Sequence, residues 1–397
     1  MQFSSRTNWT LAPNQLTKRL SALEQSGTEI LDLTESNPTQ VGFQYSSDVI
    51  LSSLTDSKNL SYQPSPLGIR EARETVAEYY NAKGASVHPD QILLTASTSE
   101  AYSAIFRLIA NPGERVLMPR PSYPLFHFLT GLNDVELDPY TLTYHKTWRI
   151  DFDGIRKSFK PKTKAIVLVN PNNPTGSFVK KDELVKLNQF AEGNQLCIIS
   201  DEVFADFQWE KKTDGLTTLA GNHQSLTFTL SGISKVLGLP QMKISWIVVS
   251  GPKELVRQSI ERLEIILDTY LSVNAPAQNA LHHWMQLKDR MQKQILKRVL
   301  SNRSFLQKSG QLEMLEADAG WYAVLKLPKK KSEEDWAIEI LEKDHVLVHP
   351  GYFYDFQEEP FIVVSLLVDP SVFEAAITKI SKRVAVSQRH SETKICL

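Results

Sequence analysis

The sequence predicts an α/β protein with a three-layer αβα large domain, built on a mainly parallel sheet, and a smaller α+β domain. Three observations lead to this prediction. The 397 residues exceed what one compact core usually accommodates. The middle of the chain alternates short apolar runs with helix-patterned segments, and from about Pro252 the pattern becomes mainly helical. Alternation of strands and helices is typical of a layered α/β domain.

The strands expected in the large domain are short runs of continuous rather than alternating hydrophobicity. Such runs indicate strands that are covered on both faces, as in a parallel or mixed sheet. The runs are Gln91–Ser97, Arg115–Arg120, Ala165–Asn170, Gln195–Ser200, Ser225–Ser231 and Ile244–Ser250.

The helices expected between these strands have apolar residues at helical spacing. Two of them end before helix-breaking residues. The helix expected at Gly68–Lys83 precedes Gly84, and the one expected at Thr98–Ile109 precedes an Asn-Pro-Gly turn. A third helix is expected at Lys181–Glu192.

The last part of the chain predicts a second, smaller domain. A long segment of mixed polarity, Ala275–Gly310, precedes a region with a few short strands and two amphipathic stretches, Glu333–Lys343 and Val372–Lys382. We therefore divide the chain into four parts. They are an N-terminal segment at 1–40 that packs on the small domain, a large domain at 41–275, the small domain at 276–386 and a frayed polar tail at 387–397.

Charge and composition exclude several classes of protein. Lys plus Arg (44) nearly balances Asp plus Glu (45), and a net charge of -1 argues against a nucleic-acid partner. Two cysteines cannot form a disulfide framework, and no His or Cys cluster indicates a metal site. The start of the chain has no apolar signal core, and no stretch approaches the ~18 apolar residues of a membrane span. We expect a cytoplasmic protein that binds no membrane.

Two segments place polar residues directly after predicted strands. Residues 165–176 run from an apolar strand into a turn rich in Asn and Pro. These residues either punctuate a loop or bind a ligand, since α/β sheets bind ligands at the carboxyl ends of their strands. A second strand ends in Asp201-Glu202. An Asp in this position is commonly a helix cap, but it can also bind a metal or pair with a positively charged ring nitrogen.

A third segment, 229–243, places Lys235 in a Ser/Gly-rich loop that apolar residues follow. Most lysines are solvated surface charges. A lysine among small and apolar residues is instead desolvated and becomes an amine nucleophile, which forms Schiff bases with carbonyl cofactors.

The order of these motifs, each at a strand end, makes the sequence similar to the class I/II aminotransferases, which are fold type I pyridoxal-phosphate enzymes. The resemblance runs from about Leu31 to Leu366. The matching motifs are the Asn-Pro-Thr-Gly turn at Asn173–Gly176, the Asp-Glu strand end at Asp201-Glu202 and the Ser-Lys pair at Ser234-Lys235.

The resemblance implies a role for each matching residue. Lys235 would hold the cofactor aldehyde as a Schiff base and, once freed, move the α-proton. Asp201 would keep the pyridine nitrogen protonated, so that the ring accepts electrons. Asn173 would donate to the phenolate oxygen of the ring and contact the substrate, and Tyr123 would stack on the ring.

The resemblance also implies groups that bind the phosphate of pyridoxal 5'-phosphate. Hydroxyls and backbone N–H groups at a helix N-terminus suit a dianionic phosphate. The residues in these positions are Ser97, Thr98, Ser99, Ser231, Ser234 and Lys243. Tyr62 matches a tyrosine that reaches the phosphate of the neighbouring subunit, which implies a homodimer with shared active sites.

The sequence departs from the family pattern at four positions. Lys243 replaces an arginine, which keeps the charge but loses the bidentate fork. Phe204 replaces a tyrosine that donates to the ring, and Ser36 replaces the glycine of the substrate-binding loop. Val363 replaces the arginine that grips the substrate α-carboxylate. Either another cation binds that carboxylate, or the substrate carries none there.

We expect a pyridoxal-phosphate-dependent aminotransferase of biosynthesis that moves an amino group between an amino donor and a keto acid. A lyase, decarboxylase or cyclase on the same fold is the alternative, because these enzymes share the carbanion chemistry. A non-catalytic cofactor-sensing module is more remote, since no helix-turn-helix precedes this domain. Pocket residues are expected among the aromatics near the C-terminus, which are equally suited to the core of the small domain. They are Trp321, Tyr322, Tyr352, Phe353 and Tyr354.

Overall fold

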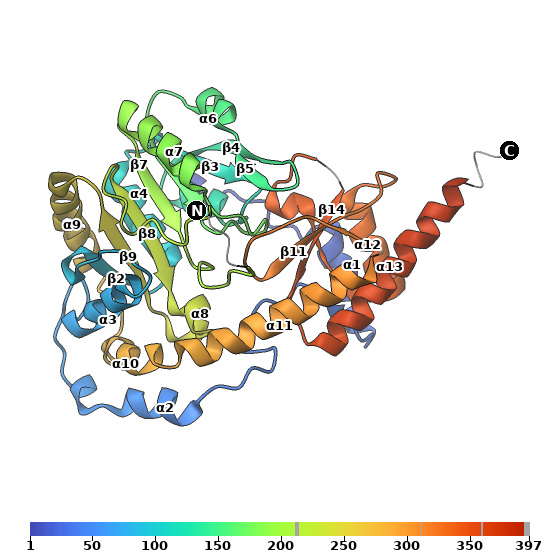
Figure 1. The fold of residues 1–397 in the computed structure, drawn as a ribbon, viewed down its shortest axis with the longest axis horizontal. Coiled ribbons are helices and arrows are strands. Elements are labelled where there is room, and N and C mark those ends of the chain that lie inside the picture. The colour runs from blue at the N-terminus through green and yellow to red at the C-terminus, as the bar shows by residue number, and fades with distance from the viewer. Residues whose placement is uncertain (211–213, 311, 359, 393–397) are drawn as a thin grey trace.

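The computed structural model describes residues 1–397 except 211–213, 311, 359 and 393–397. A large sheet and a smaller sheet, each with its own helices, lie side by side (Figure 1). Within the described residues no helix is both long enough and apolar enough to cross a bilayer.

The large sheet has eight strands in the order β2-β9-β8-β7-β6-β3-β4-β5. The four pairings from β4 through β3, β6 and β7 to β8 are parallel, and the pairings of β2, β9 and β5 are antiparallel. The α/β class with a mainly parallel sheet is therefore confirmed. The strands are β2 (Ile92–Thr95), β3 (Arg115–Arg120), β4 (Glu136–Tyr144), β5 (Trp148–Ile150), β6 (Thr163–Val169), β7 (Cys197–Asp201), β8 (Thr227–Gly232) and β9 (Ser245–Ser250).

Helices cover both faces of this sheet, because successive strand residues point to opposite sides. Val167 faces a core shared with α4, α5 and α9, whereas Ile166 faces the core beneath α6 and α7. The helices α3 and α10 cover β2 and β9 on that second side. These helices are α3 (Arg70–Asn81), α4 (Thr98–Ile109), α5 (Phe126–Leu132), α6 (Phe152–Ser158), α7 (Lys181–Gly193), α9 (Lys253–Asp268) and α10 (Ala275–Met285).

The small sheet is antiparallel, in the order β10-β11-β14-β13. Helices α11, α12 and α13 share one buried core with it. The expected long segment from Ala275 to Gly310 is two helices, α10 and α11. The elements of this part are α11 (Lys288–Ser309), β10 (Glu313–Met314), β11 (Tyr322–Lys326), α12 (Glu333–Asp344), β12 (Val346–Leu347), β13 (His349–Pro350), β14 (Phe361–Ser365) and α13 (Pro370–Glu392).

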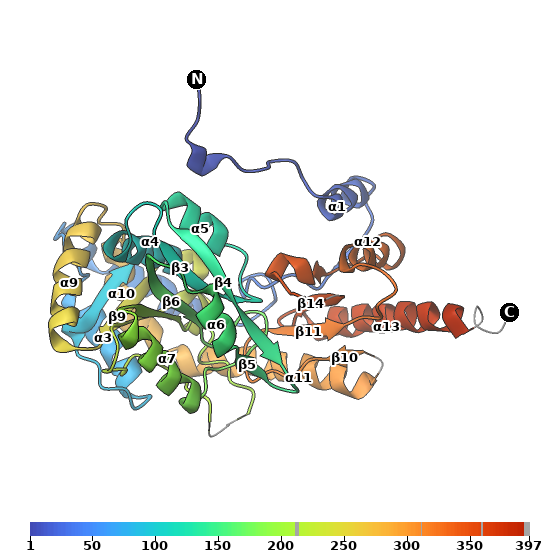
Figure 2. The ribbon, with the colours of Figure 1, turned by 90° about the horizontal axis from the view of Figure 1, so that it is seen from above.

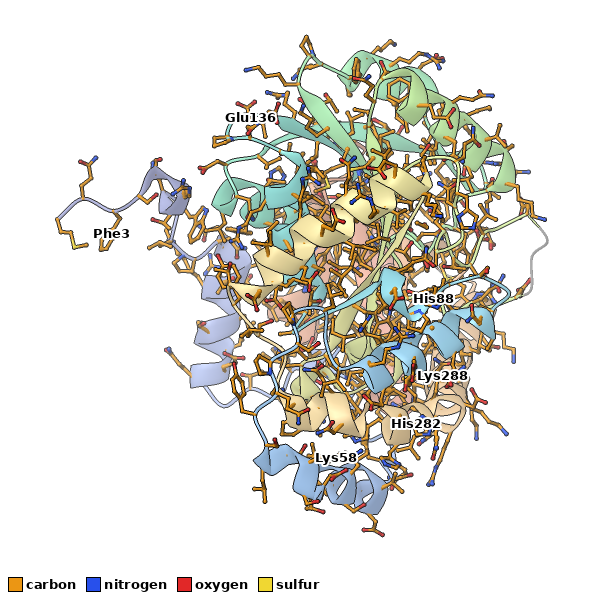
Figure 3. The ribbon with its side chains drawn as sticks, turned by 90° about the vertical axis from the view of Figure 1, so that its left-hand side faces the viewer. Phe3, Lys58, His88, Glu136, His282 and Lys288 are labelled. Carbon is orange, nitrogen blue, oxygen red and sulfur yellow. The ribbon has the colours of Figure 1, made fainter. Side chains whose placement is uncertain are left out.

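The N-terminal segment lies against the small sheet. The helix α1 (Gln15–Gln25) contacts α12, and β1 (Leu31–Asp32) pairs in parallel with β12. Residues before α1 run away from the small sheet toward α5 (Figure 2), where Trp9 packs on Phe128 at 5.4 Å between ring centroids. Phe3 projects away from the body of the molecule (Figure 3). The remaining short helices are η1 (Ser5–Thr7), α2 (Ser47–Ser52), η2 (Ser53–Thr55), η3 (Ser57–Leu60), η4 (Pro89–Gln91), α8 (Ile233–Val236), η5 (Pro240–Met242) and η6 (Gly351–Tyr354).

The loop 316–321, which we call the junction loop, fastens the small sheet to the large one. Its Asp318 N–H donates to the Gly176 oxygen at 3.0 Å, and the Asp318 oxygen accepts from the Trp209 N–H at 2.9 Å. The buried Lys180 ammonium lies 2.7 Å from the Asp318 carboxylate. Gly176 has φ 67°, and a Cβ there would lie 2.3 Å from the Ala319 oxygen. Only glycine therefore fits this close approach.

We expect Gly176→Ala to lower the free energy of unfolding by at least about 2 kcal/mol, because the left-handed conformation and the contact with Ala319 both disfavour a side chain. Urea unfolding at constant pH measures the change. Gly131→Ala is the matched control, since its Cβ would meet no atom within 4 Å and it lies in α5. That variant should be neutral or slightly stabilised. Equal stability of Gly176→Ala and the wild type would contradict the tight junction.

Candidate active site

The candidate site lies at the carboxyl ends of β6, β7 and β8, which are adjacent and parallel. Three of the predicted motifs follow these strands, so the parallel register brings them to one edge of the sheet. The strand β8 leads directly into α8, which carries Lys235. Gly232 between them is required, because a Cβ there would lie 2.2 Å from the Ser245 Oγ on β9.

Lys235 is a desolvated amine. Its Nζ lies 5.1 Å from the centroid of the Trp321 ring and 5.7 Å from that of the Phe204 ring. Burial lowers the pKa of Lys235 to about 8, although the Asp201 carboxylate opposes the shift. A fraction of the amine is therefore unprotonated near neutral pH, as a nucleophile requires.

Asp201 ends β7 and is 9% exposed. Burial raises the pKa of its carboxyl to about 6, against the hydrogen bonds that it accepts and the charge of Lys235. The donors are the Val203 N–H at 3.2 Å and the Tyr102 hydroxyl at 3.2 Å. A carboxylate held in this way suits a cationic partner, because a second positive charge offsets its desolvation.

Glu202, the other carboxylate of the motif, points elsewhere. Its Oε1 accepts from the Ser200 hydroxyl at 2.9 Å and from the Leu219 N–H at 2.7 Å, so it fixes the chain after β7. Burial raises the pKa of Glu202 to about 7. We therefore assign Glu202 a structural role.

Asn173 and Tyr123 border the same edge. The Asn173 side chain is 8% exposed, and its Oδ1 is buried without a hydrogen-bond partner among the described residues. This oxygen is an acceptor, so it is available to a donor on a bound molecule, whereas the expected donation would come from the amide nitrogen. Tyr123 is 42% exposed, and burial followed by the charge of Asp201 raises its pKa. Both causes favour the protonated hydroxyl of Tyr123.

The expected phosphate-binding residues fall into two groups. Ser97 is the N-cap of α4, with its Oγ accepting from the Glu100 N–H at 3.2 Å, and Thr98 and Ser99 form the first turn. Ser231 and Ser234 flank the β8–α8 junction, and the buried Ser231 hydroxyl lies 3.5 Å from the Glu202 oxygen.

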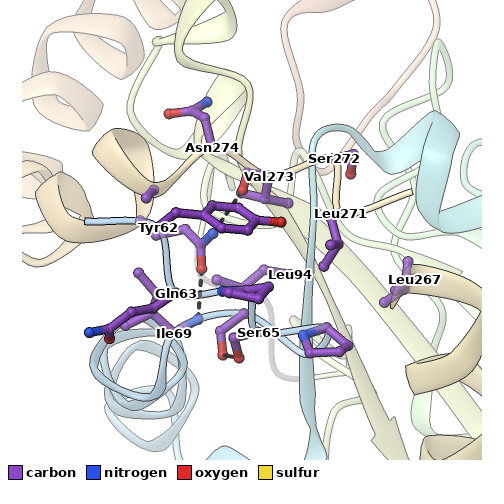
Figure 4. A pocket seen from close by; sticks show the side chains of 15 residues that line it. Tyr62, Gln63, Ser65, Ile69, Leu94, Leu267, Leu271, Ser272, Val273 and Asn274 are labelled. Carbon is purple, nitrogen blue, oxygen red and sulfur yellow. Dashed lines mark hydrogen bonds between the residues drawn. The ribbon is translucent and has the colours of Figure 1, made fainter. Parts of the chain in front are cut away.

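Lys243 and Tyr62, the two other residues expected at the phosphate, are both exposed. Lys243 is exposed, with φ 50°, and makes no ion pair within the described part of the chain. Tyr62 is 79% exposed and borders a surface cavity of about 260 Å³ that Asn274 and Gln278 also line (Figure 4). Lys235 does not line this cavity, so the structure does not bring Tyr62 to the amine of its own chain.

The departures from the family pattern are also visible. Phe204 is buried and packs edge-on against Trp321, with 5.2 Å between the ring centroids. Its ring has no hydroxyl, so the donor that the family's tyrosine supplies is missing. Ser36 lies in the loop that precedes α2 and accepts or donates a hydrogen bond with the Tyr322 hydroxyl. Val363 is fully buried in the centre of the small sheet.

Sequence reasoning missed Tyr102 and treated Trp321 and Tyr322 as equally suited to the core. Tyr102 had one usable signal, since it lies four residues after Thr98 and therefore on the same face of α4. Trp321 is fully buried yet lies against Lys235. Trp321 is therefore both a core residue and a neighbour of Lys235. Tyr352, in contrast, is 41% exposed and contacts Glu334.

The described groups fit pyridoxal phosphate. The chain offers a desolvated amine for an aldehyde, a buried carboxylate for a ring nitrogen and an unsatisfied amide, and the N-terminus of α4 suits a phosphate. A sheet edge of this composition defines an enzyme that acts on amines and carbonyl compounds through a lysine.

The chain belongs to the class I and II aminotransferase family, whose model matches residues 28–380. This range confirms the resemblance found from the motifs. The glutamate-pyruvate aminotransferase AlaA of Haemophilus influenzae is 26% identical over 377 residues, which cover 92% of this chain and 93% of that protein. The protein of the same name from Escherichia coli is 29% identical over 266 residues, which cover 66% of this chain and 65% of that protein.

Solved structures share the fold. The alanine aminotransferase from Pyrococcus furiosus superposes with a TM-score of 0.87 at 22% identity, covering 97% of this chain and 100% of that chain. An aminotransferase from Escherichia coli gives a TM-score of 0.84 at 23% identity, covering 97% and 98%. The protein is therefore an enzyme of the aminotransferase family, and pyridoxal phosphate is the cofactor that the family implies.

Proposed function

We propose that the protein transfers an amino group between an amino acid and a keto acid, with pyridoxal phosphate held covalently at Lys235. The observation that carries this proposal is the buried amine of Lys235, whose pKa is about 8, beside the buried carboxylate of Asp201. The names of the relatives, which include glutamate-pyruvate and alanine aminotransferases, make alanine and glutamate the first donors to test.

When bound, pyridoxal phosphate supplies a ring that withdraws electrons from the amino carbon. Lys235 would bond to its aldehyde carbon and, once released, take up and return the proton at the amino carbon. Asp201 would hold a proton on the ring nitrogen, because its carboxylate is desolvated and gains from a cationic neighbour. Asn173 and Tyr123 would orient the ring from the turn after β6 and the loop after β3.

The phosphate would bind at the N-terminus of α4, where the backbone N–H groups of Thr98 and Ser99 have no partner within the helix. Lys243 would add the positive charge, since it lies beside α8 and no described carboxylate pairs with it. Ser231 and Ser234 would contribute hydroxyls from the β8–α8 junction.

We also propose a cytoplasmic homodimer with shared active sites, acting in biosynthesis. Tyr62 supports the shared site, because a tyrosine that is 79% exposed next to a cavity is suited to contact a second chain. Leu271, which is 38% exposed and lines the same cavity, adds apolar surface that a second chain would cover.

An amino donor added alone should convert the absorbance of the bound aldehyde cofactor to that of the amine form, and a keto acid should reverse the change. Stopped-flow spectra with alanine, glutamate and pyruvate measure both halves of the reaction. A lyase, decarboxylase or cyclase would consume the donor without accumulating the amine form of the cofactor. Product accumulation without conversion of the cofactor would therefore favour the alternative function.

A further inference from the structure

Val363 leaves a gap in the recognition of the substrate. It occupies the position of the arginine that grips the α-carboxylate in the resembled family, and it is fully buried in β14. A carboxylate that enters a partly dry pocket without a donor is strongly disfavoured. A substitute donor would have to come from another residue that faces the same side of the small sheet.

His349 is the direct neighbour of Val363 across the small sheet. The register pairs Val363 with Val324 of β11 on one side and with His349 of β13 on the other. Residues directly opposite each other in antiparallel strands point to the same face, with Cβ atoms about 5 Å apart. His349 therefore points to the face from which the family's arginine would extend.

The same face leads to the cofactor site through tyrosines. His349 Nδ1 lies 3.1 Å from the Tyr354 hydroxyl, and Tyr354 is 4% exposed. Burial raises the pKa of Tyr354, and the neighbouring phenols of Tyr322 and Tyr123 raise it further. The Tyr354 backbone oxygen accepts from the Ser122 N–H at 2.9 Å, so Tyr354 lies beside the loop after β3 that carries Tyr123. Tyr354 thus connects His349 with the loop after β3, which borders the same sheet edge as Asp201.

We propose that His349, oriented by Tyr354, binds the substrate carboxylate in place of the arginine that Val363 replaces. The inference rests on the transamination proposed above. When the Tyr354 hydroxyl donates to Nδ1, the ring proton lies on Nε2, which then donates to the carboxylate. Among the described residues, His349 Nε2 has no hydrogen-bond partner of its own.

His349 should bind a carboxylate more weakly than an arginine would. Burial lowers the pKa of His349, against the opposing charge of Asp32, so the ring of the free enzyme is mostly neutral at pH 7. One neutral N–H replaces the two N–H groups of a guanidinium fork. His349 is therefore a specificity-determining residue. It favours small amino donors that carry a carboxylate over those that carry none, and its affinity for the carboxylate is modest.

The test compares alanine with isopropylamine, in which a methyl group replaces the carboxylate. In the cofactor-loaded enzyme, His349→Phe should raise the KM for alanine at least about 10-fold while kcat changes less than about 3-fold, as expected for lost uniform binding. The reaction of isopropylamine should not change. His349→Gln, which keeps an N–H donor, should recover most of the affinity for alanine. Tyr354→Phe should weaken alanine binding in the same direction.

A binding measurement without turnover separates this inference from the proposed function. Propionate should quench the tryptophan fluorescence of the wild type at lower concentrations than that of His349→Phe. This difference would support the inference even if neither amine converted the cofactor, which would refute only the transamination. Tyr352→Phe is the matched control for Tyr354→Phe, because Tyr352 lies in the same short helix η6 as Tyr354 but contacts Glu334.

Two outcomes would overturn the inference. One is an unchanged KM for alanine and unchanged propionate binding in His349→Phe. The other is an equal loss for alanine and isopropylamine, which would indicate general damage to the site. The double variant His349→Phe, Val363→Arg should restore alanine binding where it folds, and the Gln variant provides the rescue where it does not.

Discussion

Replacing Lys235 with alanine is expected to abolish transamination, with kcat falling at least about 10³-fold, because one side chain supplies both the covalent attachment and the proton transfer. Borohydride reduction of the wild type should fix the cofactor to Lys235, and peptide mass spectrometry locates the adduct. The variant should retain the fold, since a desolvated ammonium is removed rather than a packed apolar group.

Lys253→Ala is the control for Lys235→Ala, because Lys253 is exposed at the start of α9. It should keep both the adduct and the activity. An intact adduct in Lys235→Ala would show that a different lysine holds the cofactor, and the assignment of the site would then be wrong.

Asp201→Asn should lower kcat at least about 10³-fold, because the amide no longer keeps a ring nitrogen protonated. The same change should stabilise the cofactor-free protein by about 3 kcal/mol at pH 7, since a pKa raised from 3.8 to about 6 disfavours the ionised folded state. The folded protein binds this proton more tightly than the unfolded chain does. The contribution of Asp201 to the stability of the wild type therefore falls as pH rises from 3.8 to about 6, and its cost is fully present above that interval.

Urea unfolding of the cofactor-free proteins between pH 4 and pH 8 measures this difference. Asp201→Asn should lack the part of the decrease that Asp201 causes, while the buried Glu202, whose pKa is about 7, contributes a decrease to both proteins. Asp153→Asn, an exposed control in α6, should follow the wild type at every pH. A loss of activity below about 10-fold would exclude Asp201 as the partner of the ring nitrogen. A variant less stable than the wild type at pH 7 would show that the hydrogen bonds of the carboxylate outweigh its desolvation.

Much of the large domain could be predicted because its central strands are buried on both faces. The six predicted runs correspond to β2, β3, β6, β7, β8 and β9. The strands β4 and β5 were missed. Along β4 buried residues alternate with partly exposed ones, so it has no continuous apolar run. It also contains Pro139, which tends to argue against a central strand.

The candidate site was predictable where a motif lies at a strand end. Asp201 and Lys235 follow buried strands directly, and parallel pairing brings them together. The small-domain side was not predictable in the same way, because it depends on pairing between distant residues. His349 and Val363 are fourteen positions apart, and only the register of β13 with β14 makes them neighbours. Nothing local in the sequence distinguishes His349 from an ordinary loop histidine.

The junction loop is a fixed point of attachment between the small sheet and the large domain. Asp318 and Gly320 are both hydrogen-bonded to the large domain, and Trp321, whose ring centroid lies 5.1 Å from the Lys235 Nζ, follows Gly320 directly. A rotation of the small sheet about this point would move Trp321 very little and the far end of α13 the most. Trp321 is therefore held beside Lys235 by hydrogen bonds to the large domain as well as by the small sheet.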